Sequence, residues 1–286
     1  MINPQLSIII PAKNECNGLA SILPVIRRLY PETEILVIDD GSTDATSEIA
    51  EAAGARVLRQ PYSKGNGAAI KAGARAAKGD ILVFMDADGQ HQPEDIRSLL
   101  SKLNEGYDMV VGARSRTSQA GMHRATANGV YNQLASWMVG HKVEDLTSGF
   151  RAVRAEKFKK FLYLLPNGFS YPTTITMCFF RAGFPIAYHP IHAPKRIGKS
   201  HLRIWRDGVR FLLIMFRIAT LYSPLKLFFP ASLAFFIGGI GYSIYTLSQL
   251  HRFTNMSALL FITAILIFLI GLVSEQITML NYKGSE

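Results

Sequence analysis

The sequence predicts an α/β fold in which a mostly parallel sheet carries helices on both faces, followed by an amphipathic helix and a two-helix transmembrane hairpin. Three observations lead to this prediction. Short apolar runs alternate with helical patterns over residues 1–115, and acidic or polar segments follow three of these runs. Two long apolar stretches, residues 227–250 and 257–280, come late in the chain. The first part therefore has the pattern of a doubly wound sheet, and the last part that of a membrane anchor.

Five apolar runs are bounded by turn residues and are predicted as strands. They are residues 6–10, 34–38, 55–58, 80–85 and 108–113, and helical patterns lie between them at residues 18–29, 43–53, 66–78 and 93–105. A run as apolar as residues 81–85 is typical of a strand buried on both faces. Because ligands bind at the carboxyl ends of the strands in such sheets, we expect the segments "PAKNE", "DDGSTD" and "DADGQH" to converge on one crevice.

Residues 114–200 are mixed and polar, and their pattern predicts mainly loops. The expected loops are residues 114–124, 144–151 and 192–201, and a helix is expected over residues 171–183. Residues 202–222 then change character, because four arginines share one helical face and apolar side chains line another. The arginines are Arg203, Arg206, Arg210 and Arg217, and the apolar residues are Trp205, Val209, Leu212 and Phe216. Such a helix is typical of a membrane interface, and packing on a soluble domain is the alternative.

The two late apolar stretches exceed the roughly 20 residues that a membrane-spanning helix needs. The first carries no charge, and Glu275 is the only charged residue of the second. A buried helix pair is the alternative, but nothing else in the chain is large enough to cover it. Basic residues crowd between residues 195 and 226, whereas the turn between the stretches holds one arginine, so the positive-inside rule places both termini in the cytoplasm. We therefore expect a cytosolic domain over residues 1–200, an interfacial region over 201–226 and a hairpin over 227–286.

Composition narrows the possible partners. The chain of 286 residues has a formal net charge of +10, which predicts nucleic acid, lipid headgroups or phosphorylated substrates as anionic partners. The basic residues concentrate beside apolar stretches, which favours lipid over nucleic acid. Its two cysteines, Cys16 and Cys178, form no disulfide framework and fit a reducing compartment. The N-terminus has no basic segment and too short an apolar core for a signal peptide, so we expect the first domain to stay in the cytosol.

Two acidic motifs follow the predicted strands. Asp86 and Asp88 in "DADGQH" have the pattern of an ordinary turn, but at the carboxyl end of a central strand they suit a hard divalent cation bridged to a diphosphate. The ligands of an EF-hand loop are missing. Asp39 and Asp40 in "VIDDGSTD" precede a helix start, which a simple N-cap explains. Two adjacent acids exceed what capping needs and suit hydrogen bonds to a nucleobase and ribose.

The three motifs "PAKNE", "DDGSTD" and "DADGQH", in this order and spacing, resemble those of the GT-A glycosyltransferases of family 2, whose fold is Rossmann-like. The C-terminal anatomy is similar to that of the polyprenyl-phosphate group, which includes dolichol-phosphate mannose synthase and bacterial undecaprenyl-phosphate glucosyltransferases. The resemblance covers nearly the whole chain. It implies a nucleotide-sugar site built from Pro11, Ala12, Glu15, Asp39, Asp40, Lys64, Asp86, Asp88, Arg196 and Lys199. Ser63 departs from the asparagine that the family usually has before this lysine.

The resemblance also implies a metal site and an acceptor site. Asp86, Asp88 and Gln90 are expected to hold Mg²⁺ or Mn²⁺, although Asp86 has the alternative of bonding the donor sugar or ribose. Arg114, Arg124 and Ser148 are expected to bind a lipid phosphate, for which the arginine fork is suited. Asp145 is expected to orient an arginine or hydroxyl, or else to cap its loop. The expected catalytic set is Asp86, Asp88, Arg114, Arg124 and Asp145, whereas His91, His189, His192 and His201 are expected to be structural.

The activity that the resemblance implies is inverting transfer of a sugar from a nucleotide-sugar, UDP-sugar rather than GDP-sugar, to a polyprenyl monophosphate. It would occur at the cytoplasmic face of the plasma membrane, and a homo-oligomer is left open. A processive polysaccharide synthase is an alternative, but its Gln-x-x-Arg-Trp motif and additional spans are absent from the sequence. A membrane-anchored nucleotide-binding module without catalysis is a second alternative, and the presence of Arg114, Arg124 and Arg196 argues against it.

Overall fold

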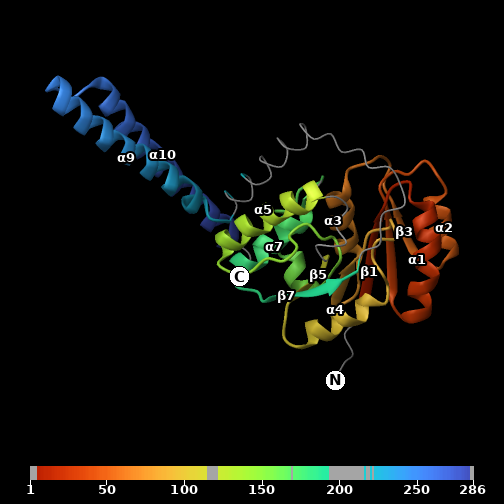
Figure 1. The fold of residues 1–286 in the computed structure, drawn as a ribbon. Coiled ribbons are helices and arrows are strands. Elements are labelled where there is room, and N and C mark those ends of the chain that lie inside the picture. The colour runs from red at the N-terminus through yellow and green to blue at the C-terminus, as the bar shows by residue number, and fades with distance from the viewer. Residues whose placement is uncertain are drawn as a thin grey trace. The chain divides into compact units, whose positions relative to one another are not determined.

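A computed structural model describes residues 5–114, 122–168, 170–192, 216, 220 and 222–283 of the chain. The chain divides into two compact units, Met1–Leu202 and Arg203–Glu286. Figure 1 shows an α/β sheet domain and a pair of long helices. The expected amphipathic helix over residues 202–222 lies outside the described residues, apart from residues 216, 220 and 222.

The first unit is built on a seven-stranded sheet with strand order β3-β2-β1-β4-β6-β5-β7. The strands are β1 (Leu6–Ala12), β2 (Glu34–Asp39), β3 (Arg56–Arg59), β4 (Ile81–Phe84), β5 (Met109–Arg114), β6 (Arg151–Arg154) and β7 (Ile186–Ile191). β6 is antiparallel to both β4 and β5, and the other pairs are parallel. The predicted mostly parallel sheet is therefore confirmed.

Helices cover both faces of this sheet. They are α1 (Cys16–Leu29), α2 (Thr46–Ala52), α3 (Asn66–Ala76), α4 (Asp95–Asn104), α5 (Met122–Val139), α6 (Ala155–Lys159) and α7 (Tyr171–Arg181). Alternate residues of β1 face opposite layers, as the two-residue period of a strand requires. Ile8 and Ile10 pack in one core cluster with apolar residues of α1 and α4. Ile9 lies on the other face against Gly73 of α3, where an added Cβ would come within 2.4 Å of its side chain.

The structure corrects the prediction that residues 114–124 and 144–151 are loops throughout. Residues 122–124 begin α5, and Arg151 begins β6. The sequence "RAVR" of β6 has arginine at both ends and no apolar run, so its pattern does not indicate a strand. It becomes one because β4 and β5 both leave a hydrogen-bonding edge for it. The third expected loop, residues 192–201, lies outside the described residues from residue 193 onward.

The second unit contains α9 (Pro224–Leu250) and α10 (Asn255–Lys283), which lie side by side (Figure 1). By length and composition both are apolar enough to cross a membrane, as predicted. The hydroxyl of Ser232 donates to the carbonyl of Ala264 at 2.8 Å, and Gly239 lies against the ring of Phe261. Side-chain packing and hydrogen bonds therefore join the two helices as a hairpin.

Glu275, the only charged residue of the second apolar stretch, has a structural partner. Its Oε2 accepts a hydrogen bond from the main-chain N–H of Leu225 at 3.2 Å. Leu225 is the second residue of α9, where main-chain N–H groups have no partner within the helix. The side chain of Ser223, which precedes α9, makes no capping hydrogen bond. Glu275 therefore caps α9 from the neighbouring helix.

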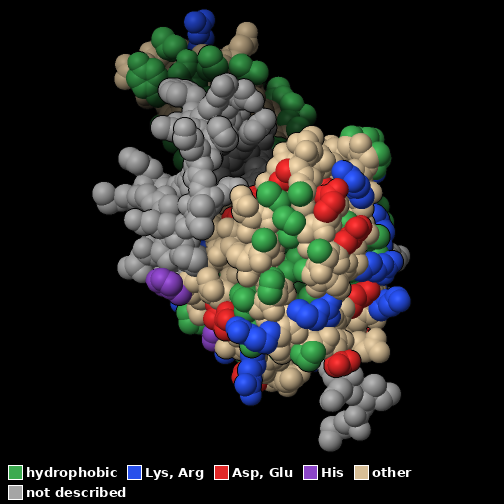
Figure 2. Space-filling model, turned by 90° about the vertical axis from the view of Figure 1, so that its right-hand side faces the viewer, with side chains coloured by type: hydrophobic (Ala, Val, Ile, Leu, Met, Phe, Trp, Pro, Cys, Tyr) green, Lys and Arg blue, Asp and Glu red, His purple; other side chains and the backbone are tan. Residues whose placement is uncertain are grey.

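Charge is mixed on the surface of the first unit. On the face shown in Figure 2, lysine and arginine side chains alternate with aspartate and glutamate. Some charges of this unit are paired, as in Arg56 with Glu34 and Arg154 with Asp108. Positive and negative side chains are therefore interspersed on the face that Figure 2 shows.

Candidate active site

The carboxyl ends of β1, β2 and β4 open into one cleft of about 410 Å³. It is lined by Pro11, Ala12, Lys13, Glu15, Asp40, Ser63, Gly65, Asn66, Ala69, Asp86 and Asp88. The expectation that three polar strand exits converge on one crevice is thus confirmed. Parallel pairing explains the convergence, because it brings the ends of neighbouring strands to the same edge of the sheet.

The segments that follow β1 and β2 are bonded to each other. The main-chain N–H of Asn14 donates to Ser42 Oγ at 3.0 Å, and that of Thr43 donates to Asn14 Oδ1 at 2.8 Å. The N–H of Glu15 donates to Thr46 Oγ1 at 3.1 Å. Asn14 has a φ of 54°, a conformation in which asparagine is favoured over most non-glycine residues. These bonds hold Glu15 at the wall of the cleft.

Asp39 is buried and hydrogen-bonded inside the protein. Its side chain is fully buried, Oδ1 accepts the N–H of Ser42 at 2.7 Å, and Oδ2 accepts the hydroxyl of Ser47. Burial alone would raise the pKa of Asp39, but the hydrogen bonds from Ser42 and Ser47 outweigh it, and the pKa lies below its usual value. Asp39 therefore shapes the turn after β2, and its predicted role toward a nucleotide stays a prediction.

Asp40 organises the turn that contains Ser63 and Lys64. Its Oδ1 accepts the N–H of Lys64 at 2.7 Å, while Oδ2 accepts the Ser63 hydroxyl at 2.7 Å and the N–H of Gly65 at 3.0 Å. Gly65 has a φ of 99°, which a side chain would strain. Ser63 thus supplies a bond to Asp40 at the position where the sequence departs from the family pattern. The ammonium of Lys64 lies 5.4 Å from the centre of the Tyr62 ring.

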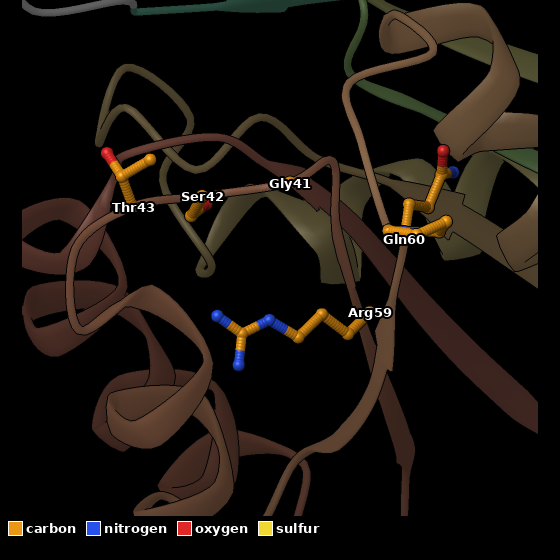
Figure 3. Close-up of a pocket in the computed structure, with 6 residues that line it drawn as sticks. Gly41, Ser42, Thr43, Arg59 and Gln60 are labelled. Atoms are coloured by element: carbon orange, nitrogen blue, oxygen red, sulfur yellow. The ribbon is translucent and has the colours of Figure 1, made fainter.

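A second pocket of about 440 Å³ lies along the same β2 exit (Figure 3). It is lined by Gly41, Ser42, Thr43, Arg59, Gln60 and Pro61. The Arg59 side chain extends from the end of β3 beneath Gly41 and Ser42, and the amide of Gln60 points away from it (Figure 3). The Nε of Arg59 is 3.7 Å from Asp39 Oδ2, so this arginine partly balances the buried carboxylate.

The turn after β4 carries the two remaining carboxylates of the cleft. Asp88 Oδ1 accepts the N–H of Gln90 at 3.1 Å across Gly89, whose φ is 75°. The N–H of Asp86 donates to His91 Nδ1 at 3.0 Å. Burial lowers the pKa of His91 and favours the neutral ring that this acceptor requires. The turn therefore has defined bonds on both sides of Asp88.

The carboxylates suit a hard divalent cation that is shared with a ligand. Oxygen donors are the ligands that Mg²⁺ and Mn²⁺ prefer, and Asp86 and Asp88 both line the cleft. Within the described ranges, no three of the His, Cys, Asp and Glu side chains are grouped closely enough to enclose a metal. Mg²⁺ is commonly bound by one or two carboxylates together with substrate phosphates. The residues present fit that arrangement better than a closed protein site.

Arg114 and Asp145 form the charged pair of the expected acceptor side. Arg114 Nε donates to Asp145 Oδ2 at 2.8 Å, and Nη2 donates to Oδ1 at 3.0 Å and to Thr147 Oγ1 at 2.7 Å. Burial alone would raise the pKa of Asp145, but its bonds to Arg114 and the positive charge outweigh it and lower the pKa. The expected contact between Asp145 and an arginine is thus present, and so is the alternative loop cap, because Oδ1 also accepts the main-chain N–H groups of Thr147 and Ser148.

The loop that carries Asp145 lies directly against the carboxylate of Asp86. An added Cβ on Gly149 would come within 2.9 Å of Asp86 Oδ2, so a side chain at this position would displace the Asp86 carboxylate. The fully buried guanidinium of Arg151 donates to the carbonyl oxygen of Ser148 and to that of Pro172 at 3.1 Å, which anchors the end of the loop. The hydroxyl of Ser148 is itself buried, and its predicted contact with an acceptor phosphate stays a prediction.

Comparison with known proteins agrees with this architecture. Residues 7–162 match the family described as Glycosyl transferase family 2. The chain belongs to this family. Residues 223–280 match the GtrB C-terminal hairpin, in agreement with α9 and α10. The resemblance predicted from the three acidic and polar motifs is therefore confirmed.

Several known proteins are similar to this chain over most of their length. Glycosyltransferase AglJ of Haloferax volcanii is 29% identical, covering 96% of this chain and 94% of its own. A dolichyl-phosphate hexose transferase of the same organism is 32% identical over 71% of this chain and 89% of its own. The polyprenol monophosphomannose synthase of Mycolicibacterium smegmatis is 29% identical over 74% of this chain and 84% of its own.

Solved structures support the GT-A-like fold of this family 2 glycosyltransferase. Glucosyl-3-phosphoglycerate synthase from Mycobacterium tuberculosis, in complex with phosphoglyceric acid, matches with a TM-score of 0.62 and 23% identity, covering 76% of this chain and 79% of that chain. The same enzyme with Mn²⁺, UDP and glucosyl-3-phosphoglycerate matches with a TM-score of 0.58 and 25% identity, over 74% and 80% of the two chains.

Some predicted site residues of this glycosyltransferase lie outside the described parts of the chain. Arg196 and Lys199 belong to residues 193–200, which the structure does not describe. Arg124 lies in the first turn of α5, but its side chain is not among those described. The structure therefore brings Asp86 and Asp88 close to the loop that carries Asp145, and the roles of all the predicted site residues stay predictions.

His91 was expected to be structural, and it bonds the main chain of Asp86. Two other supporting residues were not singled out from the sequence. Thr147 shares Arg114 with Asp145. Asn132 of α5 donates to the carbonyl of Glu144 at 2.6 Å and accepts the N–H of Leu146 at 3.0 Å. Each partner is distant in sequence or belongs to a main-chain group, and an asparagine inside a helical pattern gives no local signal.

Proposed function

We propose that this family 2 glycosyltransferase transfers a sugar from a nucleotide-sugar to a polyprenyl monophosphate, with inversion at the anomeric carbon. The observation that carries the proposal is the close approach of two chemically distinct groups. The loop that carries Asp145, to which Arg114 of β5 is bonded, lies against Asp86, which itself lines the cleft with Asp88. An anionic acceptor beside Arg114 would thus lie next to a donor whose diphosphate is held at the carboxylates.

The donor side suits a nucleoside diphosphate sugar. The cleft combines main-chain and side-chain groups of three strand exits with two carboxylates that fit a divalent cation. When bound, Mg²⁺ or Mn²⁺ would neutralise the charge that develops on the departing diphosphate. The solved enzyme at 25% identity contains Mn²⁺ and UDP, which supports a UDP-sugar here. Asp86, Asp88 and Gln90 are the residues that would hold the cation, and Lys64, Arg196 and Lys199 would lie toward the nucleotide.

The acceptor side suits a phosphate. Arg114 donates Nε–H and both N–H groups of Nη2 to Asp145 and Thr147. Among the described residues Nη1 has no hydrogen-bond acceptor, and we propose that this nitrogen binds the acceptor phosphate. Arg114 can therefore present the two N–H groups of Nη1, while Asp145 fixes the plane of the guanidinium. The names of the dolichyl-phosphate and polyprenol relatives, and the matching hairpin, support a polyprenyl phosphate as the acceptor.

The reaction then needs no side chain to remove a proton from the acceptor. A phosphate monoester has a second pKa of about 6 and is mostly dianionic at neutral pH. Arg114 and Arg124 would hold it in line with the anomeric carbon, so that one phosphate oxygen forms the new bond as the bond to the leaving diphosphate breaks. Asp145 is ill suited to act as a base, because its pKa is lowered and both oxygens accept bonds from Arg114. Catalysis therefore depends on alignment and charge stabilisation.

We further propose that α9 and α10 anchor the enzyme in the plasma membrane, with both termini in the cytoplasm. This keeps the division into a catalytic domain over residues 1–200, an interfacial region over 201–226 and a hairpin over 227–286. The positive-inside rule supports the orientation. Reporter fusions at residue 286 and in the turn at residues 251–254 test it, because only the turn should report from the far side of the membrane.

The deciding experiment is a transfer assay with labelled sugars. The purified full chain, reconstituted with polyprenyl phosphate and Mn²⁺, is given UDP-glucose or GDP-mannose, and label is measured in extracted lipid and in polymer. The proposal is supported if label appears in the lipid with polyprenyl phosphate as the acceptor but not with polyprenol, which lacks the phosphate. Label in a polymer would indicate a processive synthase, and nucleotide binding with no transfer from any donor would indicate a binding module.

A further inference from the structure

His91 lies beneath the Asp86–Asp88 turn and is only 4% exposed. β4 pairs with β1, and the N–H of Met85 still donates to the carbonyl of Ile9 at 3.1 Å. At Asp86 the chain leaves the sheet, so its N–H needs a different acceptor. That acceptor is His91 Nδ1, at 3.0 Å. An N–H shielded from water and without a partner would be costly, so this bond stabilises the start of the turn.

The ring of His91 also packs against the acceptor-side loop. It stacks on the ring of Phe150, with centroids 4.9 Å apart and an interplanar angle of 15°. Phe150 is fully buried, and its carbonyl oxygen accepts the N–H of Gly112 in β5 at 2.9 Å. Phe150 directly follows Gly149, whose main chain approaches the Asp86 carboxylate. The same histidine thus contacts the main chain of Asp86 on one side and the loop residue Phe150 on the other.

We propose that His91 is a positioning residue that fixes the Asp86–Asp88 turn against the acceptor-side loop, residues 144–150. The proposal rests on the proposed function, because the distance between the donor carboxylates and Arg114 matters only if a donor and an acceptor bind at these two places. With Nδ1 occupied as an acceptor and the ring face covered by Phe150, His91 acts through Asp86. A purely apolar side chain would fill the same space but would leave the N–H of Asp86 unbonded.

Three substitutions distinguish the effect of the hydrogen bond to Asp86 from the effect of the ring that stacks on Phe150. His91→Asn keeps an acceptor near the Nδ1 position and loses the ring. His91→Phe keeps a ring against Phe150 and loses the acceptor, and His91→Gln displaces the acceptor by one methylene. His189→Asn, on β7, is the matched control for loss of a histidine outside the site.

The measurements are the kcat for sugar transfer, the KM for each substrate and the binding of UDP by calorimetry with and without Mn²⁺. We expect His91→Asn, which retains the bond to Asp86 but loses the stacking on Phe150, to lose less than either of the other two variants. His91→Phe and His91→Gln should lose about 10- to 100-fold in kcat, as removal of a group that orients a metal ligand does. They should also lose the gain in UDP affinity that Mn²⁺ confers, while metal-free UDP binding persists. A wild-type rate for His91→Phe, or equal losses in His91→Asn and His91→Phe, would overturn the proposal.

The binding measurement keeps this test separate from the proposed reaction. If the wild-type chain transferred no sugar to lipid, the proposed function would fail, but the split in Mn²⁺-dependent UDP binding between His91→Asn and His91→Phe would still decide the positioning role. If His91→Phe did not fold, His91→Gln would carry the comparison, because it retains a polar group in the same volume.

Discussion

Asp145 holds Arg114 through two side-chain hydrogen bonds, from Nε to Oδ2 at 2.8 Å and from Nη2 to Oδ1 at 3.0 Å. The carboxylate is 2% exposed and also accepts the main-chain N–H of Arg114 at 3.2 Å. The aspartate thus fixes both the start and the end of the arginine side chain. A phosphate that binds at Nη1 would meet a guanidinium whose orientation is already set.

Arg114→Lys should therefore weaken the acceptor side selectively. Lysine retains the charge but cannot bond Asp145 and a phosphate in one plane. We expect the KM for polyprenyl phosphate to rise more than the KM for the nucleotide-sugar, measured by steady-state transfer. Arg154→Lys is the matched control, because Arg154 also pairs with an aspartate, Asp108 at 3.4 Å. Weaker donor binding alone would reverse the assignment of the two sides.

The same pair predicts a pH-dependent contribution to stability. The pKa of Asp145 is lower in the folded chain than in the unfolded chain, where it is about 3.9. A depressed carboxyl pKa contributes stability above the unfolded value, and this contribution is lost as pH falls through the folded value. Asp145→Asn should thus lower the free energy of unfolding by about 2 kcal/mol at pH 7. This is less than the usual cost of breaking a fully buried ion pair, because Arg114 is partly exposed to solvent.

This difference between wild type and Asp145→Asn should shrink below about pH 4, because the wild-type carboxyl is then being protonated. Denaturant unfolding of the detergent-solubilised chain at several pH values measures it. A difference that stayed constant down to pH 3 would show that the ion pair contributes nothing to the acid sensitivity of the fold.

The pH dependence of the rate tests whether the acceptor phosphate needs a base. We expect the rate to fall on the acidic side with an apparent pKa at or below that of the lipid phosphate, about 6, because the arginines favour its charged form. Asp145→Asn should lower the rate but should hardly change the apparent pKa of this fall on the acidic side, the acid limb of the profile. A loss of several orders of magnitude together with disappearance of the acid limb would make Asp145 the base.

Asp88→Asn tests the metal site. The amide keeps the shape of the side chain but is a poorer ligand for a hard cation, so activity should fall by about 10- to 100-fold or more while the fold survives. Circular dichroism reports the fold, and transfer measured against Mn²⁺ concentration reports the site. Asp80→Asn, at an exposed aspartate before β4, provides the control. Full activity of Asp88→Asn in EDTA would end the metal assignment.

Glu275 tests the hairpin. Glu275→Gln retains an oxygen that can accept the N–H of Leu225, whereas Glu275→Leu leaves that N–H without the cap. We expect the leucine variant to lose about 1 kcal/mol, the usual value of a helix cap, and the glutamine variant to lose less. Thermal unfolding in detergent measures the difference. Equal stability of both variants would mean that the carboxylate serves another purpose.

The sequence predicts strands best where both faces of the sheet are buried. β1, β2 and β4 are covered on both faces, so their residues form unbroken apolar runs that predict strands directly. β7 lies at an edge and contains His189 and Pro190, which conceal it in the sequence. β6 is concealed in a different way, since Arg151 is fully buried and bonded to main-chain carbonyls. No pattern of hydropathy predicts a buried arginine.

The candidate site could be predicted in part for the same physical reason. Asp40, Asp86 and Asp88 follow strands of one parallel sheet, so topology alone brings them to one cleft. The partners of these groups are set by tertiary contacts. Neither the bond from Asp86 to His91 nor that from Arg114 to Thr147 has a signature in the sequence, because each depends on how a turn lies in space.

The position of β6 has a consequence for synthesis on the ribosome. β6 lies between β4 and β5 in the sheet, yet it is translated after both. A nascent chain that stops before residue 151 has Asp40, Asp86 and Asp88 but lacks the strand that joins β5 to the rest. We expect the nucleotide-binding half to fold first during translation, and Arg114 to be docked only when Arg151–Arg154 emerge. A nucleotide in the cell would then favour folding of the nascent chain by binding to it, before the acceptor side has formed.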